Sequence, residues 1–333
     1  MSKTPIPNPD PFIVAEISCN HNGSLDRAVE LINSAAKAGA DAVKFQAYDP
    51  FNMVADRSYV LPAGPWEGRN LYDLYTEAAT PYDWFPTLFD VAASAKIEAF
   101  ASVFDIEGLA MLERLNCPRY KIASFEITDI PLIRAVAETG KPMIISTGIA
   151  TTEDAHAAVR AASKDLTMLL CTSAYPADPA EIGLQNMVGM KKWWGCKVGI
   201  SDHTKGIGVA IAATALGAQV IEKHLVNPGE RTLDSDFSLP PDQFEILVNG
   251  CREARKSLNP HTFGPSKGAM RFLRRSLWTI APVAAGEAFT HGNVAARRID
   301  TGMPPIELRS VFRCRAARDL PAGVPLIREM LIS

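Results

Sequence analysis

The stretch CKVGISDHTKGIGVAIAATALGAQVIEKHLV, residues 196–226, contains two short β-branched segments separated by a segment with helical spacing. A strand, a helix and a second strand in this order are typical of a parallel sheet with crossover helices. The first strand candidate closes on His203 and the second on His224. If the two strands are neighbours, both imidazoles lie at the same edge of the sheet, where they can hold a divalent metal.

The same alternation of strand-like and helix-like segments runs from Phe12 to about Leu258. Roughly eight apolar stretches indicate strands, beginning at Phe12, Ala42, Ile97, Tyr120, Pro142, Leu166, Cys196 and Gln219. Helical spacing of apolar residues appears over residues 25–39, 81–95, 106–115, 132–140, 152–162 and 208–217. Eight such strands close a (β/α)8 TIM barrel of about 250 residues, so we expect an α/β barrel over residues 1–260. A doubly wound open sheet is the alternative, although no GxGxxG follows the first strand.

The chain changes character after the predicted barrel. Residues 261–275 contain Gly, Pro and Ser and are expected to form a linker. Residues 276–333 then show short strand-like segments and tight turns. The fragments PVAAGEAF and RDLPAGVPL within them look like one motif used twice. The sequence therefore predicts a second domain that is small and mostly β.

Composition restricts the class of protein. The 333 residues are 47% hydrophobic and 21% charged, as in a globular protein. A net charge of −3 provides no basic field for nucleic acid, which favours a small-molecule ligand. No apolar run has the length of a signal peptide core or a membrane span, so we expect a cytoplasmic protein without a membrane partner. The six cysteines lie far apart and are expected to be reduced thiols.

Polar side chains end several predicted strands, at the rim where parallel barrels build active sites. Lys44 and Lys121 lie within apolar strands, and a buried ammonium group is costly unless an anion is near it. The hydroxyls of Ser124, Ser146 and Ser201 are donors that suit phosphate oxygens. This pattern predicts a phosphate or carboxylate ligand beside the metal.

Two carboxylates share this rim, Glu16 at the end of the first strand and Glu126 after the fourth. They are candidates for acid and base chemistry, but they could also pair with Lys44 and Lys121 as structural ion bridges. The other rim residues are Gln46, Ser102, Phe104, Ser173 and Tyr175.

A set of motifs resembles one known family, the nonulosonic (sialic) acid synthases. In chain order these motifs are FIVAEISCNHNGSLDRAVELINSAAKAGADAVKFQAY, YKIASFEITD, ISTGIAT, CTSAYP, GISDHT and VIEKHL. The segment from RRSLW onward resembles the C-terminal antifreeze-like SAF domain of that family. The resemblance covers nearly the whole chain, and the motifs together are specific although each alone is weak.

The resemblance implies condensation of phosphoenolpyruvate with the open-chain aldehyde of an acetamido sugar. Such enzymes break the C–O bond of phosphoenolpyruvate, release phosphate and form a nine-carbon 2-keto acid. The stretches YKIASFE, GRNLYDLYTEAATPYDWF and LDSDFSL look most like the branch of the family that uses 2,4-diacetamido-2,4,6-trideoxy-L-altrose.

The resemblance also implies roles for single residues. His203 and His224 would hold Mn²⁺, Mg²⁺ or possibly Co²⁺, with water and the aldehyde oxygen completing the shell. Glu16 and Glu126 would share two tasks, handling the attacking water and moving the sugar's proton, and their division is open. Arg298 would reach across a domain-swapped homodimer to the N-acetyl group of the partner's substrate.

Substrate contacts follow from the same resemblance. The phosphoenolpyruvate carboxylate would be bound by Lys44 and Ser102. Its phosphate would be bound by Lys121, Ser124, Ser146, Ser173 and Ser201. The sugar would face Gln46, Tyr175 and Asp234.

Several alternatives remain open. The sugar could be that of an N-acetylneuraminate or N,N′-diacetyllegionaminate synthase. A metal-dependent pyruvate aldolase would use a similar barrel but would not need the serine set. A non-catalytic carbohydrate-binding protein would have no use for so many costly charges at the strand ends. His21 could be a rim residue, but the Asn and Gly beside it favour a turn, and Arg298 could form only a surface ion pair.

Overall fold

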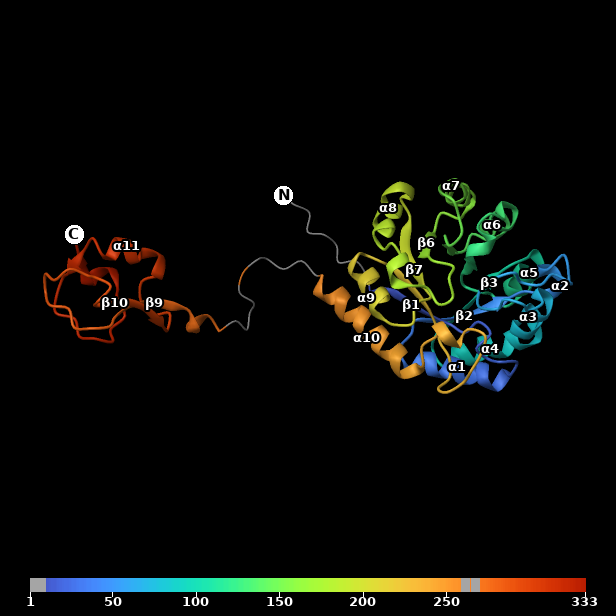
Figure 1. Cartoon of the computed structure of the whole chain (residues 1–333), viewed down its shortest axis with the longest axis horizontal. Helices are drawn as coiled ribbons and strands as arrows, with labels where there is room; N and C mark the ends of the chain where they lie inside the picture. The colour runs from blue at the N-terminus through green and yellow to red at the C-terminus, as the bar shows by residue number, and fades with distance from the viewer. Residues whose placement is uncertain (1–9, 259–263, 265–269) are drawn as a thin grey trace. The chain divides into compact units, whose positions relative to one another are not determined.

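The computed structural model describes residues 10–258, 264 and 270–333. The chain divides into two compact units, Met1–Pro260 and His261–Ser333 (Figure 1). The predicted linker, residues 261–275, lies partly outside the described residues.

The first unit is built around a closed parallel barrel in which each strand pairs with the next and β1 pairs with β8. The strands are β1 (Phe12–Glu16), β2 (Ala42–Ala47), β3 (Glu98–Val103), β4 (Tyr120–Ile122), β5 (Met143–Ser146), β6 (Leu166–Cys171), β7 (Lys197–Asp202) and β8 (Val220–His224). Almost all of their residues are buried, as expected for strands covered on both faces. The predicted barrel is confirmed, and the doubly wound alternative is wrong because the sheet has no open edge.

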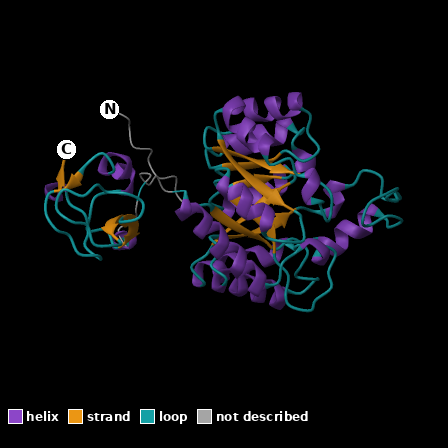
Figure 2. Ribbon diagram, turned by 60° about the vertical axis from the view of Figure 1, so that its left-hand side comes forward, coloured by secondary structure: helices purple, strands orange, loops and turns teal. Residues whose placement is uncertain are grey.

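Helices surround the strands (Figure 2). The helices that lead from each strand to the next, or follow the last strand, are α1 (Leu25–Lys37), α4 (Phe85–Ser94), α5 (Ile106–Arg114), α6 (Ile130–Glu138), α7 (Thr152–Ala161), α8 (Gln185–Trp194), α9 (Gly208–Ala215) and α10 (Pro241–Ser257). Side-chain caps begin several of them; Thr151 and Asp154 form a reciprocal capping box at the start of α7. Helix α1 buries one face, formed by Ala28, Leu31, Ile32 and Ala35.

The connection between β2 and β3 carries two additional short helices, α2 (Pro50–Met53) and α3 (Leu71–Ala78). Neither α2 nor α3 was predicted, and α8 and α10 were missing from the predicted helices as well. In α8, Gly189 and the polar residues around it obscure the apolar period. In α3, the polar and apolar residues are spaced for a helix, but eight residues are too few for a clear periodic signal.

The β7–β8 pair has a tightly defined register. Residue Asp202 lies opposite Lys223, and the Lys223 ammonium donates to Asp202 Oδ2 at 3.1 Å and to the Thr204 carbonyl. Both charged side chains are fully buried on the outer face of the barrel. A Cβ on Gly199 would lie 2.2 Å from the Val220 carbonyl oxygen, so glycine is required for this close approach. Because side chains alternate along a strand, the residues next to outward-pointing Asp202 and Lys223 point into the barrel.

The second unit is a small β structure. It contains two antiparallel pairs, β9 (Arg275–Thr279) with β10 (Val294–Arg298) and β11 (Arg315–Ala316) with β12 (Leu331–Ile332), and one short helix, α11 (Leu308–Val311). Its core includes Leu277, Val283, Phe289, Val294 and Leu326.

The repeated motif of this unit forms a symmetric pair of turns. Val283 and Leu320, which hold the same position in the two copies, exchange backbone hydrogen bonds of 2.9 and 2.8 Å. Gly286 and Gly323 follow at equivalent positions with φ of +80° and +84°. Positive φ explains why both turns carry glycine. Throughout the part of the chain that the structure describes, no helix is both long and apolar enough to cross a membrane.

Candidate active site

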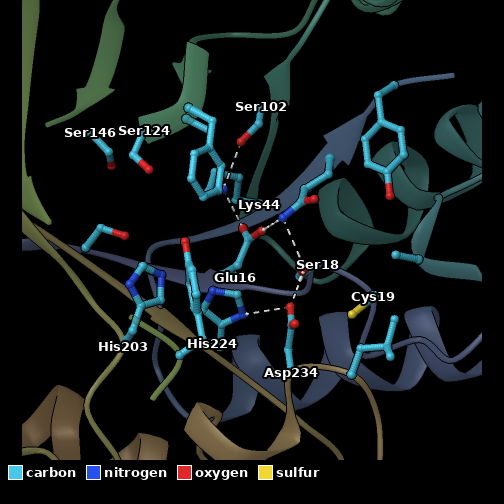
Figure 3. Close-up of a pocket in the computed structure, with 18 of the residues that line it drawn as sticks. Glu16, Ser18, Cys19, Lys44, Ser102, Ser124, Ser146, His203, His224 and Asp234 are labelled. Carbon is cyan, nitrogen blue, oxygen red and sulfur yellow. Dashed lines mark hydrogen bonds and ion pairs between the residues drawn. The ribbon is translucent and has the colours of Figure 1, made fainter. Parts of the chain in front are cut away.

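A pocket of about 260 Å³ opens at the carboxyl ends of the barrel strands (Figure 3). Thirteen of the sixteen predicted site residues line it: Glu16, Lys44, Gln46, Ser102, Phe104, Lys121, Ser124, Ser146, Tyr175, Ser201, His203, His224 and Asp234. Ser173 and Glu126 lie directly beside it, whereas Arg298 belongs to the second unit. The structure therefore brings the predicted rim residues together from all eight strands or the loops that follow them.

The floor of the pocket is a buried cluster of two lysines and two glutamates. Lys44 Nζ lies 2.7 Å from Glu16 Oε2 and 3.6 Å from Glu222 Oε1. Lys121 Nζ lies 3.8 Å from the same Glu222 oxygen. Lys44 thus forms an ion pair with Glu16, as one alternative expected, whereas the carboxylate that contacts Lys121 is Glu222 and not Glu126.

Glu222 was not predicted as a site residue. It precedes His224 by two positions and therefore points to the same side of β8, which is the signal that could have identified it. Burial alone would raise the pKa of Glu222, but Lys121 and Lys44 outweigh burial and hold that pKa below its usual value. Burial lowers the pKa of Lys121 despite Glu222. An incoming anion would counteract this effect and stabilise the Lys121 ammonium.

Hydroxyl groups form a second cluster beside the lysines. The Oγ atoms of Ser124 and Ser173 lie 2.7 Å apart, and Ser146 Oγ is buried without a hydrogen-bond partner among the described residues. Figure 3 shows Ser124 and Ser146 side by side on the same side of the pocket as Ser102. Gly148 has φ +37°, and a Cβ there would lie 2.5 Å from Ser173 Oγ. The cluster can therefore surround an anion with hydroxyl donors close to backbone.

The two histidines lie next to each other on one side of the pocket, His203 directly after β7 and His224 at the end of β8, with ring centroids 5.4 Å apart. His203 Nδ1 lies 3.2 Å from the Thr172 carbonyl oxygen. Because a carbonyl only accepts, this contact assigns the proton to Nδ1 and leaves Nε2 as a lone-pair donor. Burial lowers the pKa of His203 to about 3, so the ring is neutral, as a metal ligand must be.

His224 has a carboxylate partner. Its Nδ1 lies 3.4 Å from Asp234 Oδ2 and makes no aligned hydrogen bond to any described residue. A carboxylate behind an imidazole is the usual support of a histidine ligand. The described residues contain no group of three or more His, Cys, Asp or Glu placed to hold a metal. These two imidazoles fit a metal only if water or substrate oxygens supply the other ligands.

A chain of hydrogen bonds connects the ion cluster with Asp234, whose carboxylate lies beside His224. Gln46 Nε2 donates to Glu16 Oε1 and to Ser18 Oγ, both at 3.0 Å. Ser18 Oγ in turn donates to Asp234 Oδ2 at 2.6 Å. In Figure 3 the dashed lines run from Ser102 through Lys44 and Glu16 to Ser18, Asp234 and His224. Ser18, which sequence reasoning missed, thus joins β1 to the loop that carries Asp234.

Glu126 lies next to the hydroxyl cluster in a short 3-10 turn, Ser124–Glu126. Burial raises its pKa to about 7, and its Oε2 has no hydrogen-bond partner among the described residues. A carboxyl group with this pKa can donate or accept a proton at neutral pH.

Two further predicted residues lie away from the pocket. The His21 ring is buried against Thr80, 3.1 Å from its Oγ1, and accepts from the Gly23 amide, so the prediction of a turn is confirmed. Arg298 ends β10 as an exposed side chain.

Comparisons with known proteins place the chain among similar sequences and structures. The NeuB family model matches residues 31–262. Pseudaminic acid synthase of Helicobacter pylori is 39% identical, over 95% of this chain and 96% of that protein. N,N′-diacetyllegionaminic acid synthase of Legionella pneumophila is 31% identical, over 96% and 94%. The crystal structure of N-acetylneuraminic acid synthetase from Leptospira borgpetersenii has a TM-score of 0.70 at 31% identity, covering 78% of this chain and 89% of that chain.

Proposed function

The chain belongs to the NeuB family, and we propose that it acts as a pseudaminic acid synthase. The reaction joins C3 of phosphoenolpyruvate to the aldehyde carbon of 2,4-diacetamido-2,4,6-trideoxy-L-altrose. Water adds to C2, the bond from C2 to the phosphate oxygen breaks, and phosphate leaves. The observation that carries the proposal is one pocket that holds two buried lysines, Lys44 and Lys121, beside a serine cluster and two neighbouring histidines.

Phosphoenolpyruvate would occupy the floor of the pocket. Lys44 and Ser102, whose Nζ and Oγ lie 2.9 Å apart, would bind its carboxylate. Its phosphate would be bound by Lys121, Ser124, Ser146, Ser173 and Ser201. Charge-assisted contacts of this kind contribute about 1.5–3 kcal/mol each.

The sugar aldehyde would lie at the histidines. His203 and His224 would hold Mn²⁺, Mg²⁺ or Co²⁺, an ion that supplies Lewis-acid polarisation of the aldehyde oxygen when bound. Gln46, Tyr175 and Asp234 would orient the sugar, with Phe104 at the edge of the pocket. Glu126 would move the proton of the new hydroxyl group, because its raised pKa suits that task. Glu16 would orient the water and offset the positive charge that develops at C2.

The second unit would be an SAF domain that places Arg298 in the active site of a partner chain within a domain-swapped homodimer. Charge supports this arrangement: residues 261–333 carry 11 Lys and Arg against 5 Asp and Glu, whereas residues 1–260 carry 23 against 32. Opposite net charges would favour docking of the second unit of one chain on the barrel unit of its partner. The sequence similarity also includes both units, since it extends over 95% of the chain.

Other nonulosonate synthases are the second candidate, because the legionaminic acid synthase is also similar over nearly the whole chain. The higher identity to the Helicobacter protein favours the altrose sugar. A pyruvate aldolase does not explain the serine cluster, because pyruvate carries no phosphate. A non-catalytic binding protein does not explain the buried ion cluster.

Phosphate release from phosphoenolpyruvate tests the proposed function. The purified chain with Mn²⁺ should release phosphate with 2,4-diacetamido-2,4,6-trideoxy-L-altrose and not with N-acetylmannosamine or 2,4-diacetamido-2,4,6-trideoxymannose. A preference for either manno sugar would show that the chain is a synthase of another nonulosonic acid. Absence of release with every sugar would refute the synthase proposal.

A further inference from the structure

One side of the pocket is apolar and comes from a single segment of chain. The side chains of Leu61, Trp66, Leu71, Leu74, Tyr75 and Ala78 all line the pocket, and we call them the apolar wall. Four of them recur along α3 at the spacing of one helix face, so this face of α3 lines the pocket. Apart from buried Leu74, the wall residues remain half-buried, which leaves apolar surface for a ligand.

The charged side chains of the same segment do not reach the pocket. None of the charged residues in the described stretch 54–79 lines it. Arg69 and Glu77 instead pair with each other, and the Arg57 guanidinium lies over the rings of Phe51 and Tyr72. The wall's own hydrogen-bonding side-chain groups are the Trp66 indole and the Tyr75 phenol. Such a surface suits methyl groups and can hydrogen-bond to an amide carbonyl, but it has too few hydrogen-bonding groups to pair with several hydroxyls.

The wall adjoins the histidines through one aromatic ring. Tyr175 lies with its ring centroid 4.6 Å from His203 and 5.8 Å from Trp66. Tyr48, which also lines the pocket, anchors helix α3 by donating to the Tyr75 carbonyl at 3.2 Å. A sugar whose aldehyde carbon lies at the histidines therefore extends past Tyr175 to the wall with its far end.

We infer that the apolar wall determines sugar specificity by receiving the C6 methyl group and the methyl of the 4-acetamido group. The inference rests on the proposed function, since it takes the aldehyde end of the sugar to lie at His203 and His224. A substrate with hydroxyls at these positions would have to bury them against Leu71 and Leu74 without partners. The wall thus selects for the deoxygenated, acylated end of the sugar and against an ordinary hexosamine.

The test compares two sugars that differ by one oxygen, 2,4-diacetamido-2,4,6-trideoxy-L-altrose and the same sugar with a 6-hydroxyl group. Wild-type kcat/KM should favour the 6-deoxy sugar by at least about tenfold, the usual effect of one group in an apolar pocket. Leu71→Asn and Trp66→Ala should each reduce this ratio several-fold while the KM of phosphoenolpyruvate stays constant. Leu71→Met, which keeps the apolar volume, should retain the wild-type ratio.

The matched control is Tyr59→Ala. Tyr59 belongs to the same connection, but its side chain is exposed and does not line the pocket. This variant should leave the ratio unchanged. A wild-type enzyme that prefers the 6-hydroxy sugar, or a ratio unaffected by Leu71→Asn and Trp66→Ala, would overturn the inference while the synthase function stands. If the wild type releases phosphate with neither sugar, the proposed function fails, and the inference fails with it.

Discussion

At the scale of single residues, the environment of each carboxyl group differs. Glu222 lies between two ammonium groups that keep it ionised, whereas Glu126 is buried without such a partner. The same chemical group is therefore an anion at one position, whereas at the other its pKa is raised to about 7, so that it can exchange a proton near neutral pH. Because the two carboxyl groups have different pKa values, one pocket can bind an anionic substrate and transfer a proton at the same pH.

Glu126 should make stability depend on pH. Its folded pKa of about 7 lies above the usual value for a carboxyl group, so the folded state binds a proton more tightly than the unfolded state. Stability should thus fall as the pH rises from about 4.5 to 7 and then level off, by at most about 3 kcal/mol from this group. Glu126→Gln should remove that loss, so the variant should gain stability over wild type between pH 5 and pH 8. Urea unfolding of wild type and Glu126→Gln at pH 5 and pH 8 measures the difference in their free energies of unfolding. If that difference is the same at the two pH values, the raised pKa is refuted.

At the scale of elements, the β7–β8 pair positions three polar side chains of the pocket. Ser201, Glu222 and His224 point inward because Asp202 and Lys223 point outward and are joined by an ion pair. A shift by one residue would exchange these two sets and bury the charged pair inside the barrel. The ion pair on the outer face therefore supports the chemistry of the inner face.

Lys223→Met should be strongly destabilising, because it leaves the Asp202 carboxylate buried without its cation. The expected loss is about 3–5 kcal/mol in the free energy of unfolding. Adding Asp202→Asn to the same chain should recover most of this loss, since asparagine still accepts from the Thr204 amide as Asp202 does at 2.9 Å. Urea denaturation of the single and double variants is the measurement. Equal stability of the two would show that the loss comes from packing and not from the unpaired charge.

At the scale of the whole molecule, the chain consists of an acidic barrel unit and a basic β unit. The barrel unit contains every predicted site residue except Arg298. If Arg298 acts on a partner's substrate, a single chain has an incomplete site and the dimer is the functional unit.

Mixed dimers can test this arrangement. Arg298→Ala and His224→Ala chains should each be nearly inactive toward the sugar, although for different reasons. When they are unfolded, mixed and refolded together, about a quarter of wild-type activity should return, because half of the dimers are mixed and one of their two sites is complete. Each variant refolded alone is the control. If mixing restores nothing, Arg298 acts within its own chain or not at all.

The sequence by itself determined the order of elements and most of the pocket. Strand and helix periods, caps and glycine turns are local, so they predicted the barrel, and strand-end positions predicted residues such as Lys44, Ser146 and His203. Only the tertiary structure decided which charged groups form pairs, such as Lys121 with Glu222. It also decided that the apolar face of α3 lines the pocket. The physical reason is that alternation along a strand fixes the side a residue faces, whereas its partner depends on how distant strands pair when the barrel closes.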